Sequence, residues 1–158
     1  MTSDSIEISK KIRKTILDTA LDAGAKSAHI GGALSIVDIL AVLYSKSFLK
    51  FEPNNSQWAK RDRLILSKGH CCLAYYALLF LMGFVSKEDL NSFETDGAVL
   101  LGHPVRNIKK GIEFSTGSLG MGLSIAIGVA LSSKITSNNY NVFAIVGDGE
   151  TNEGSVWE

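Results

Sequence analysis

The end of the chain carries the pattern that most restricts its fold, an apolar run closed by a carboxylate between two glycines. Val142 to Val146 are all apolar, and Gly147-Asp148-Gly149 follows at once. Such an uninterrupted apolar run is typical of a strand that is covered on both faces of a parallel sheet. Because open parallel sheets bind ligands beyond the carboxyl ends of their strands, we expect Asp148 to lie at a ligand site.

A second strand is expected at Leu64-Ile65-Leu66, which is followed by Ser67-Lys68-Gly69-His70 and by a strongly apolar helix that reaches Met82. A strand, a glycine turn and a helix in that order predict a parallel α/β unit. With a third strand over Ala98 to Leu101, these strands are a small set for a doubly wound parallel sheet. We therefore expect an α/β fold of this class with an incomplete sheet.

Helices are expected before and between these strands. Apolar residues at helical spacing predict an opening helix over residues 8–23, closed at Gly24. Ser35 is expected to cap a second helix over residues 36–46.

Two further helices have distinctive residue patterns. Ser86 with Asp89 three residues later resembles a capping box for a short helix. Segment 117–134, GSLGMGLSIAIGVALSSK, is rich in glycine and alanine. Its small residues suit a helix pressed closely against a sheet, or against the same helix of another subunit.

Size and charge narrow the class of protein. With 158 residues, 46% hydrophobic and 20% charged, the chain fits one globular domain over residues 1–158. Lys+Arg and Asp+Glu both number 16, so charge gives no reason to expect nucleic acid or an acidic membrane surface as a partner.

The cysteines and the apolar runs indicate a cellular location. Cys71 and Cys72 are adjacent, a poor arrangement for a structural disulfide, which favours a reducing compartment. The polar N-terminus lacks the apolar core of a signal peptide. The longest apolar run, Cys71 to Val85, is shorter than the roughly 20 residues that span a bilayer. We expect a soluble, cytoplasmic protein.

The glycine-flanked Asp148 limits what its site can bind. A dinucleotide loop of the form G-x-G-x-x-G fails, because Asn152 stands at the third glycine and Asp148 would face the pyrophosphate with like charge. A bridging Mg²⁺ removes that repulsion, since this ion takes one or two carboxylates together with phosphate oxygens. Gly149 would let the backbone approach a diphosphate. The alternative is a tight turn in which Asp148 accepts backbone N–H bonds.

Each of the three histidines lies within two residues of a glycine, at His29, His70 and His103. Histidines in glycine turns at the ends of strands or helices can reach a shared cleft, whereas a core histidine more often lies within an apolar face. No pair has the spacing of zinc ligands. Each alone is as consistent with a structural or solvated side chain, but together with Asp148 they favour a functional cleft.

Five segments occur in the order and spacing found in transketolases, and the chain resembles in particular the separately encoded N-terminal subunit of some prokaryotes. These segments are SAHIGGALSIVDILAVLY, RDRLILSKGHCCLAYYAL, LGHPVR, STGSLGMGLSIAIGVAL and VGDGETNEGSVWE. The resemblance implies a thiamine-diphosphate-binding fold and an enzyme that uses thiamine diphosphate with Mg²⁺, or another divalent cation such as Ca²⁺. It also implies transfer of a two-carbon ketol unit between sugar phosphates.

The resemblance further implies roles for individual residues. His29 and His103 are similar to residues that bind the sugar and assist proton transfer, and Glu153 to a catalytic acid at the subunit interface. The implied cofactor contacts are His70, Gly117, Ser118, Leu119, Asp148 and Gly149, with Asp148 also the metal ligand.

One departure from the family concerns the metal motif, which in transketolases closes with an asparagine downstream of GDG. The chain ends at Glu158, before that position. We therefore expect an N-terminal diphosphate-binding domain that lacks its C-terminal part and is inactive alone. The resemblance implies a partner, the C-terminal transketolase subunit, which supplies the glutamate that activates the cofactor. It also implies a homo-oligomeric assembly.

Two other functions stay open at this point. One is a noncatalytic binding or assembly module that kept the fold but lost its affinity for the metal. The other is a related thiamine-diphosphate enzyme, such as a deoxyxylulose-phosphate synthase or a 2-oxoacid dehydrogenase component. The histidines favour transketolase over the latter, since sugar hydroxyls need proton transfer near neutral pH.

Overall fold

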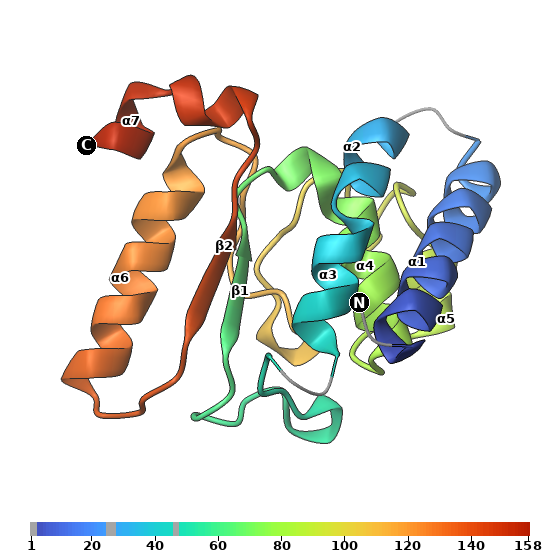
Figure 1. The fold of residues 1–158 in the computed structure, drawn as a ribbon. Helices are drawn as coiled ribbons and strands as arrows, with labels where there is room; N and C mark the ends of the chain where they lie inside the picture. Colours follow the sequence, from blue (N-terminus) through green and yellow to red (C-terminus); the bar gives the residue numbers. More distant parts are fainter. Residues whose placement is uncertain (1–2, 25–27, 46–47) are drawn as a thin grey trace.

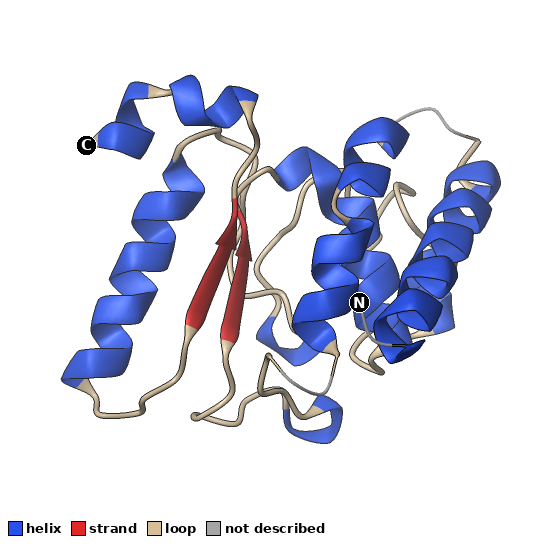
Figure 2. Ribbon diagram, in the orientation of Figure 1, coloured by secondary structure: helices blue, strands red, loops and turns tan. Residues whose placement is uncertain are grey.

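The computed structural model describes residues 3–24, 28–45 and 48–158 (Figure 1). Helices lie on both sides of a pair of adjacent strands (Figure 2). In chain order the elements are α1 (Ser3–Asp22), α2 (Ile30–Ser35), α3 (Val37–Tyr44), η1 (Pro53–Asn55), β1 (Arg63–Leu66), η2 (Gly69–Cys71), α4 (Cys72–Leu81), α5 (Lys87–Asn91), η3 (Ile108–Lys110), α6 (Met121–Ile135), β2 (Val142–Ile145), η4 (Gly149–Asn152) and α7 (Gly154–Trp157).

The sheet consists, within the described residues, of β1 and β2 in parallel. The register pairs Arg63 with Val142 and Leu66 with Ile145. Helix α6 lies on one side of the strands, while α1 to α5 lie on the other (Figure 1). The predicted α/β class and both apolar strands are therefore confirmed. Burial on both faces is expected for β2, but only Ile145 of this strand is buried.

The third strand expected over Ala98 to Leu101 is wrong, because this segment is an irregular loop. Its backbone groups bond locally and to side chains instead of to a strand. Leu100 O accepts from Glu94 N, and Leu101 O accepts from the hydroxyl of Tyr76 at 2.9 Å. Leu100 is fully buried, but Val99 and Leu101 are exposed, so the apolar run that indicated a strand is a loop with a single buried side chain.

The glycine pair Gly31-Gly32 precedes the second helix that the sequence predicts. It lies inside α2, and Ser35 ends that helix instead of capping the next one. The Ser35 hydroxyl donates back to Gly32 O at 2.7 Å, a local bond that serine readily makes in a helix, and Ile36 occupies the cap of α3. The predicted cap is therefore wrong, and Lys46, the expected end of that helix, lies outside the described residues.

The other helical predictions are confirmed. Helix α1 buries Ile12, Ile16 and Ala20 on one face and is followed by Gly24 in the left-handed conformation, with φ of 71°. Ser86 and Asp89 form the reciprocal capping box of α5.

The hydrophobic core lies on the side of the sheet that carries α1 to α4. Residues 72–79 of α4 are all buried, and Cys71 and Cys72 are free thiols within this core. No helix in the described ranges is both long and apolar enough to cross a bilayer.

On the other side of the sheet, α6 presses closely against the end of β1. A Cβ atom placed on Gly122 would lie 2.2 Å from Ser67 Oγ and 2.6 Å from Ser67 Cα, distances that real side chains do not reach. Gly128 lies further along the same helix and has open space around it. The prediction of a helix packed closely against the sheet is confirmed at Gly122.

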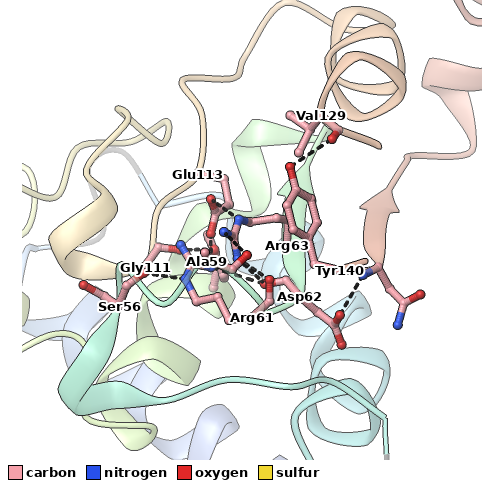
Figure 3. A network of polar contacts seen from close by, with 11 residues as sticks. Ser56, Ala59, Arg61, Asp62, Arg63, Gly111, Glu113, Val129 and Tyr140 are labelled. Atoms are coloured by element: carbon pink, nitrogen blue, oxygen red, sulfur yellow. Dashed lines mark hydrogen bonds and ion pairs between the residues drawn. The ribbon is translucent and has the colours of Figure 1, made fainter. Parts of the chain in front are cut away.

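At the amino ends of the strands, a buried polar network holds the chain together (Figure 3). Arg61 forms an ion pair with Glu113, and Arg63 Nε lies 3.6 Å from Glu113 Oε2. Asp62, 1% exposed, accepts from the backbone N–H of residue 141 at 2.7 Å. Tyr140 lies under the guanidinium of Arg63, whose central carbon is 4.5 Å from the ring centroid. This network fixes the strand ends that are furthest from the candidate site.

Candidate functional site

The candidate site lies at the carboxyl ends of β1 and β2, where parallel sheets of this kind bind ligands. Residues 67–71 follow β1 and lead through η2 into α4, while Gly147 and η4 follow β2. The start of α6 and the short helices α2 and α7 lie at the same edge (Figure 1). Segments far apart in the sequence thus meet here.

The three histidines come together at this edge, as the sequence predicts. His29 directly precedes α2, His70 lies in η2, and His103 lies in the loop before η3. The ring centroid of His29 is 5.7 Å from that of His70 and 6.2 Å from that of His103. A cavity of about 740 Å³ opens beside His29 and His103 and is also lined by Glu94 and Thr116. The site therefore presents two imidazoles that line one cavity and a third, that of His70, beside His29.

The protonation of His70 is shifted by its surroundings. Burial lowers the pKa of His70 below its usual value, and the positive charge of Lys68 acts in the same direction. A neutral imidazole keeps one nitrogen that donates and one that accepts. His70 can therefore bind a polar ligand near neutral pH without adding a positive charge.

The loop expected to hold the cofactor passes directly over η2. A Cβ atom on Gly69 would lie 2.9 Å from Gly117 N and 3.0 Å from Thr116 Oγ1, so only glycine allows this approach. Gly117 lies against His103, since a Cβ atom on it would lie 3.0 Å from His103 Cδ2, and Gly117, Ser118 and Leu119 are all exposed. The Thr116 hydroxyl is buried and has no hydrogen-bond partner in the part of the chain that the structure describes. The sequence reasoning missed Thr116, although it precedes the glycine of this loop.

The two carboxylates after β2 have opposite environments. Asp148 is exposed, and among the described residues its carboxylate makes no hydrogen bond or ion pair. Glu150 is only 2% exposed, and its Oε2 accepts from Gly147 N at 2.9 Å. The tight-turn alternative for Asp148 thus describes Glu150 instead. The sequence does not predict this role of Glu150, because a single acid two residues after Asp148 matches neither a helix-capping pattern nor a metal-ligand spacing.

The donors at this edge fit a diphosphate with a divalent cation, but only in part. Asp148 offers one carboxylate, which is within the one or two that Mg²⁺ usually takes beside phosphate oxygens. Gly149 is exposed with open space where a side chain would be, so its backbone can approach a ligand. No group of three or more His, Cys, Asp or Glu side chains within the described ranges is arranged to hold a metal ion.

Glu153, the expected acid at a subunit interface, lies at the start of α7 and is exposed. Its Cβ packs close to the start of α6, since a Cβ atom on Gly120 would lie 3.0 Å from it. Trp157 Nε1 donates to Thr151 O at 2.7 Å, which closes η4 and α7 into one compact turn.

The parallel strands, the covering helices and the glycine turns at the strand ends define an α/β protein with a candidate site at the carboxyl edge of its sheet. A family model described as "Transketolase, thiamine diphosphate binding domain" matches residues 6–158. The chain belongs to the transketolase family.

Relatives from several organisms resemble the chain closely. It is 38% identical over 159 residues to a subunit of the apulose-4-phosphate transketolase of Phocaeicola vulgatus, covering 100% of this chain and 55% of the relative. It is 42% identical over 147 residues to the 6-deoxy-6-sulfo-D-fructose transketolase subunit SqwG of a Clostridium species, covering 93% and 52%. The chain thus spans about half the length of these two relatives.

Solved structures have the same fold. The transketolase of Leishmania mexicana superposes with a TM-score of 0.89 at 30% identity, covering 99% of this chain and 24% of that one. The transketolase of Campylobacter jejuni gives a TM-score of 0.88 at 32% identity, covering 99% and 26%.

Proposed function

We propose that the chain is the diphosphate-binding domain of a transketolase N-terminal subunit, and that it transfers a two-carbon ketol unit between sugar phosphates once its partner is bound. The observation that carries this proposal is the meeting of three histidines and Asp148, whose carboxylate has no partner among the described residues, at the carboxyl edge of a parallel sheet. Relatives that match nearly the whole chain and are named as transketolase subunits support it.

Thiamine diphosphate and Mg²⁺ are the proposed cofactors. Asp148 would bind the cation, Gly149 would approach the diphosphate, and the loop of Gly117, Ser118 and Leu119 would hold the pyrimidine end. When bound, thiamine diphosphate serves as the electron sink for cleavage of a carbon–carbon bond. The single carboxylate of Asp148 supports a cation site that further ligands from outside this chain complete.

The histidines are proposed to handle the sugar. His29 and His103 line the cavity and their ring centroids lie 6.2 Å apart, so both can contact hydroxyls of the same substrate. Imidazole has an unperturbed pKa of about 6.5, which suits proton transfer near neutral pH. The lowered pKa of His70 supports a role as a neutral cofactor contact.

The proposed partner is a C-terminal transketolase subunit. The chain's likeness to relatives that are themselves named as subunits, and of which it spans about half, supports a divided enzyme. Glu153, exposed at α7, is proposed to lie at the subunit interface of a homo-oligomer.

The two free thiols support a reducing compartment such as the cytoplasm.

Reconstitution tests this function directly. The N-terminal subunit that contains this chain would be mixed with its C-terminal partner, thiamine diphosphate and Mg²⁺, and ketol transfer would be followed from a ketose phosphate to an aldose phosphate. We expect transfer that needs both subunits and falls about 10²- to 10⁴-fold in His103→Ala, the usual range for a lost acid–base group. Cofactor binding without any transfer in the reconstituted enzyme would instead indicate a noncatalytic module.

A further inference from the structure

We propose that Glu150 is a positioning residue for the cofactor, an inference that rests on the proposed function. Its buried carboxylate holds three segments of the site in one fixed arrangement. Glu150 itself need not touch the ligand, because it acts through the backbone of the residues that do.

The hydrogen bonds of Glu150 carry this inference. Its Oε1 accepts from Ser67 Oγ at 2.5 Å and from Gly120 N at 2.9 Å, while Oε2 accepts from Gly147 N at 2.9 Å. The residue is 2% exposed, so these bonds are shielded from water. Hydrogen bonds to an ionised acceptor in such surroundings are strong and restrict geometry.

The three donors come from the three segments that contain predicted cofactor contacts. Ser67 opens the turn that contains His70. Gly120 follows the loop of residues 117–119 directly, and Gly147 directly precedes Asp148. One carboxylate therefore sets the distance between the loop proposed for the pyrimidine end and the turn proposed for the metal and the diphosphate.

A carboxylate suits this position better than an amide of the same size. All three groups that face it are donors, and an ionised carboxylate is an acceptor at both oxygens. A glutamine would place its NH₂ group against at least one of these donors. Glu150→Gln should therefore release one of the three segments while it leaves the volume of the side chain unchanged.

The structure offers a matched control in Glu113. This residue is also a buried carboxylate, with its side chain 8% exposed, but it pairs with Arg61 at the opposite ends of the strands. Glu113→Gln makes the same chemical change away from the site. A loss that comes only from weaker folding should appear in both variants, whereas a loss of positioning should appear in Glu150→Gln alone.

The experiment measures thiamine diphosphate binding by calorimetry at saturating Mg²⁺, in the reconstituted two-subunit enzyme. We expect Glu150→Gln to bind the cofactor about 10- to 100-fold more weakly, as for other residues that orient ligand-binding groups, and Glu113→Gln to bind it like the wild type. At saturating cofactor, the rate of Glu150→Gln should largely recover. The cofactor concentration that gives half-maximal activity should therefore rise by a larger factor than kcat falls.

Unchanged affinity in Glu150→Gln, or an equal loss in Glu113→Gln, would overturn the inference. If Glu150→Gln does not fold, Ser67→Ala decides the question, since it removes a single donor. It should weaken binding by a smaller factor, and wild-type affinity in this variant would overturn the inference as well. A wild-type enzyme that binds no thiamine diphosphate would instead refute the proposed function.

Discussion

Gly122 gives the sharpest test of how α6 is placed over the strand ends. In Gly122→Ala the new methyl group would lie 2.2 Å from Ser67 Oγ, 2.5 Å from Ser67 Cβ and 2.6 Å from Ser67 Cα. A side-chain rotation could relieve the first contact, but the last one involves the backbone of the residue after β1. The helix must therefore move away from the sheet, and Gly120 moves with it.

Two opposing effects set the size of the change. Overpacking of a close contact costs about 1–3 kcal/mol, and the contact with a backbone atom places this case in the upper half of that range. Replacement of glycine by alanine inside a helix returns about 0.8–1.0 kcal/mol. The free energy of unfolding should therefore fall by about 1–2 kcal/mol, which lowers Tm by about 2–8 °C for a protein of this size.

Gly128→Ala is the matched control, because it makes the same change in the same helix where nothing lies within 4 Å of the new methyl group. Here only the gain in helix propensity applies, and stability should rise by about 0.5–1 kcal/mol. Urea denaturation followed by circular dichroism measures both variants. The free energy of unfolding should fall in Gly122→Ala and rise in Gly128→Ala. Stabilisation by both substitutions would show that α6 does not press on Ser67.

Two further predictions concern charged and titrating groups. Glu113→Ala leaves the buried Arg61 without its carboxylate partner and should lower the free energy of unfolding by about 3–5 kcal/mol in denaturant titrations, whereas a loss below about 1 kcal/mol would mean that the ion pair contributes little. Because the pKa of His70 is lower in the folded chain than in the unfolded one, the unfolded chain takes up the proton first, and stability should decline as pH falls below about 6.5. His70→Gln should flatten this decline in denaturation curves between about pH 7 and pH 5, and an equal slope in both proteins would contradict the assignment.

The main elements of the fold could be predicted because their signals are local. Leu64-Ile65-Leu66 and residues 142–146 are apolar runs closed by glycine turns, and parallel pairing brings those turns to the same edge. This rule places His70, which follows β1, but not His29, which precedes α2, or His103, which lies in a loop. The apolar run of residues 98–101 predicts a strand, but an apolar run alone does not distinguish a strand from a loop that buries Leu100 and bonds to the Tyr76 hydroxyl.

The role of Glu150 could not be predicted, because its partners are distant in the sequence. Ser67 lies 83 residues before it and Gly120 lies 30 residues before it. Only the folded chain shows that these donors converge on one carboxylate. Sequence reasoning identified Asp148 from its flanking glycines, yet whether it or a neighbour stabilises the turn depends on which side chain points inward.

The metal-bridged diphosphate is the central claim, and Asp148→Ala tests it most directly. Asp148 is exposed and its carboxylate has no partner among the described residues, so this substitution should leave folding intact. In the reconstituted wild-type enzyme, thiamine diphosphate at 100 times its Kd should raise the free energy of unfolding by about 2.7 kcal/mol, and only when Mg²⁺ is present. Asp148→Ala should abolish this Mg²⁺-dependent stabilisation, whereas equal stabilisation of both proteins, or stabilisation without Mg²⁺, would contradict the account.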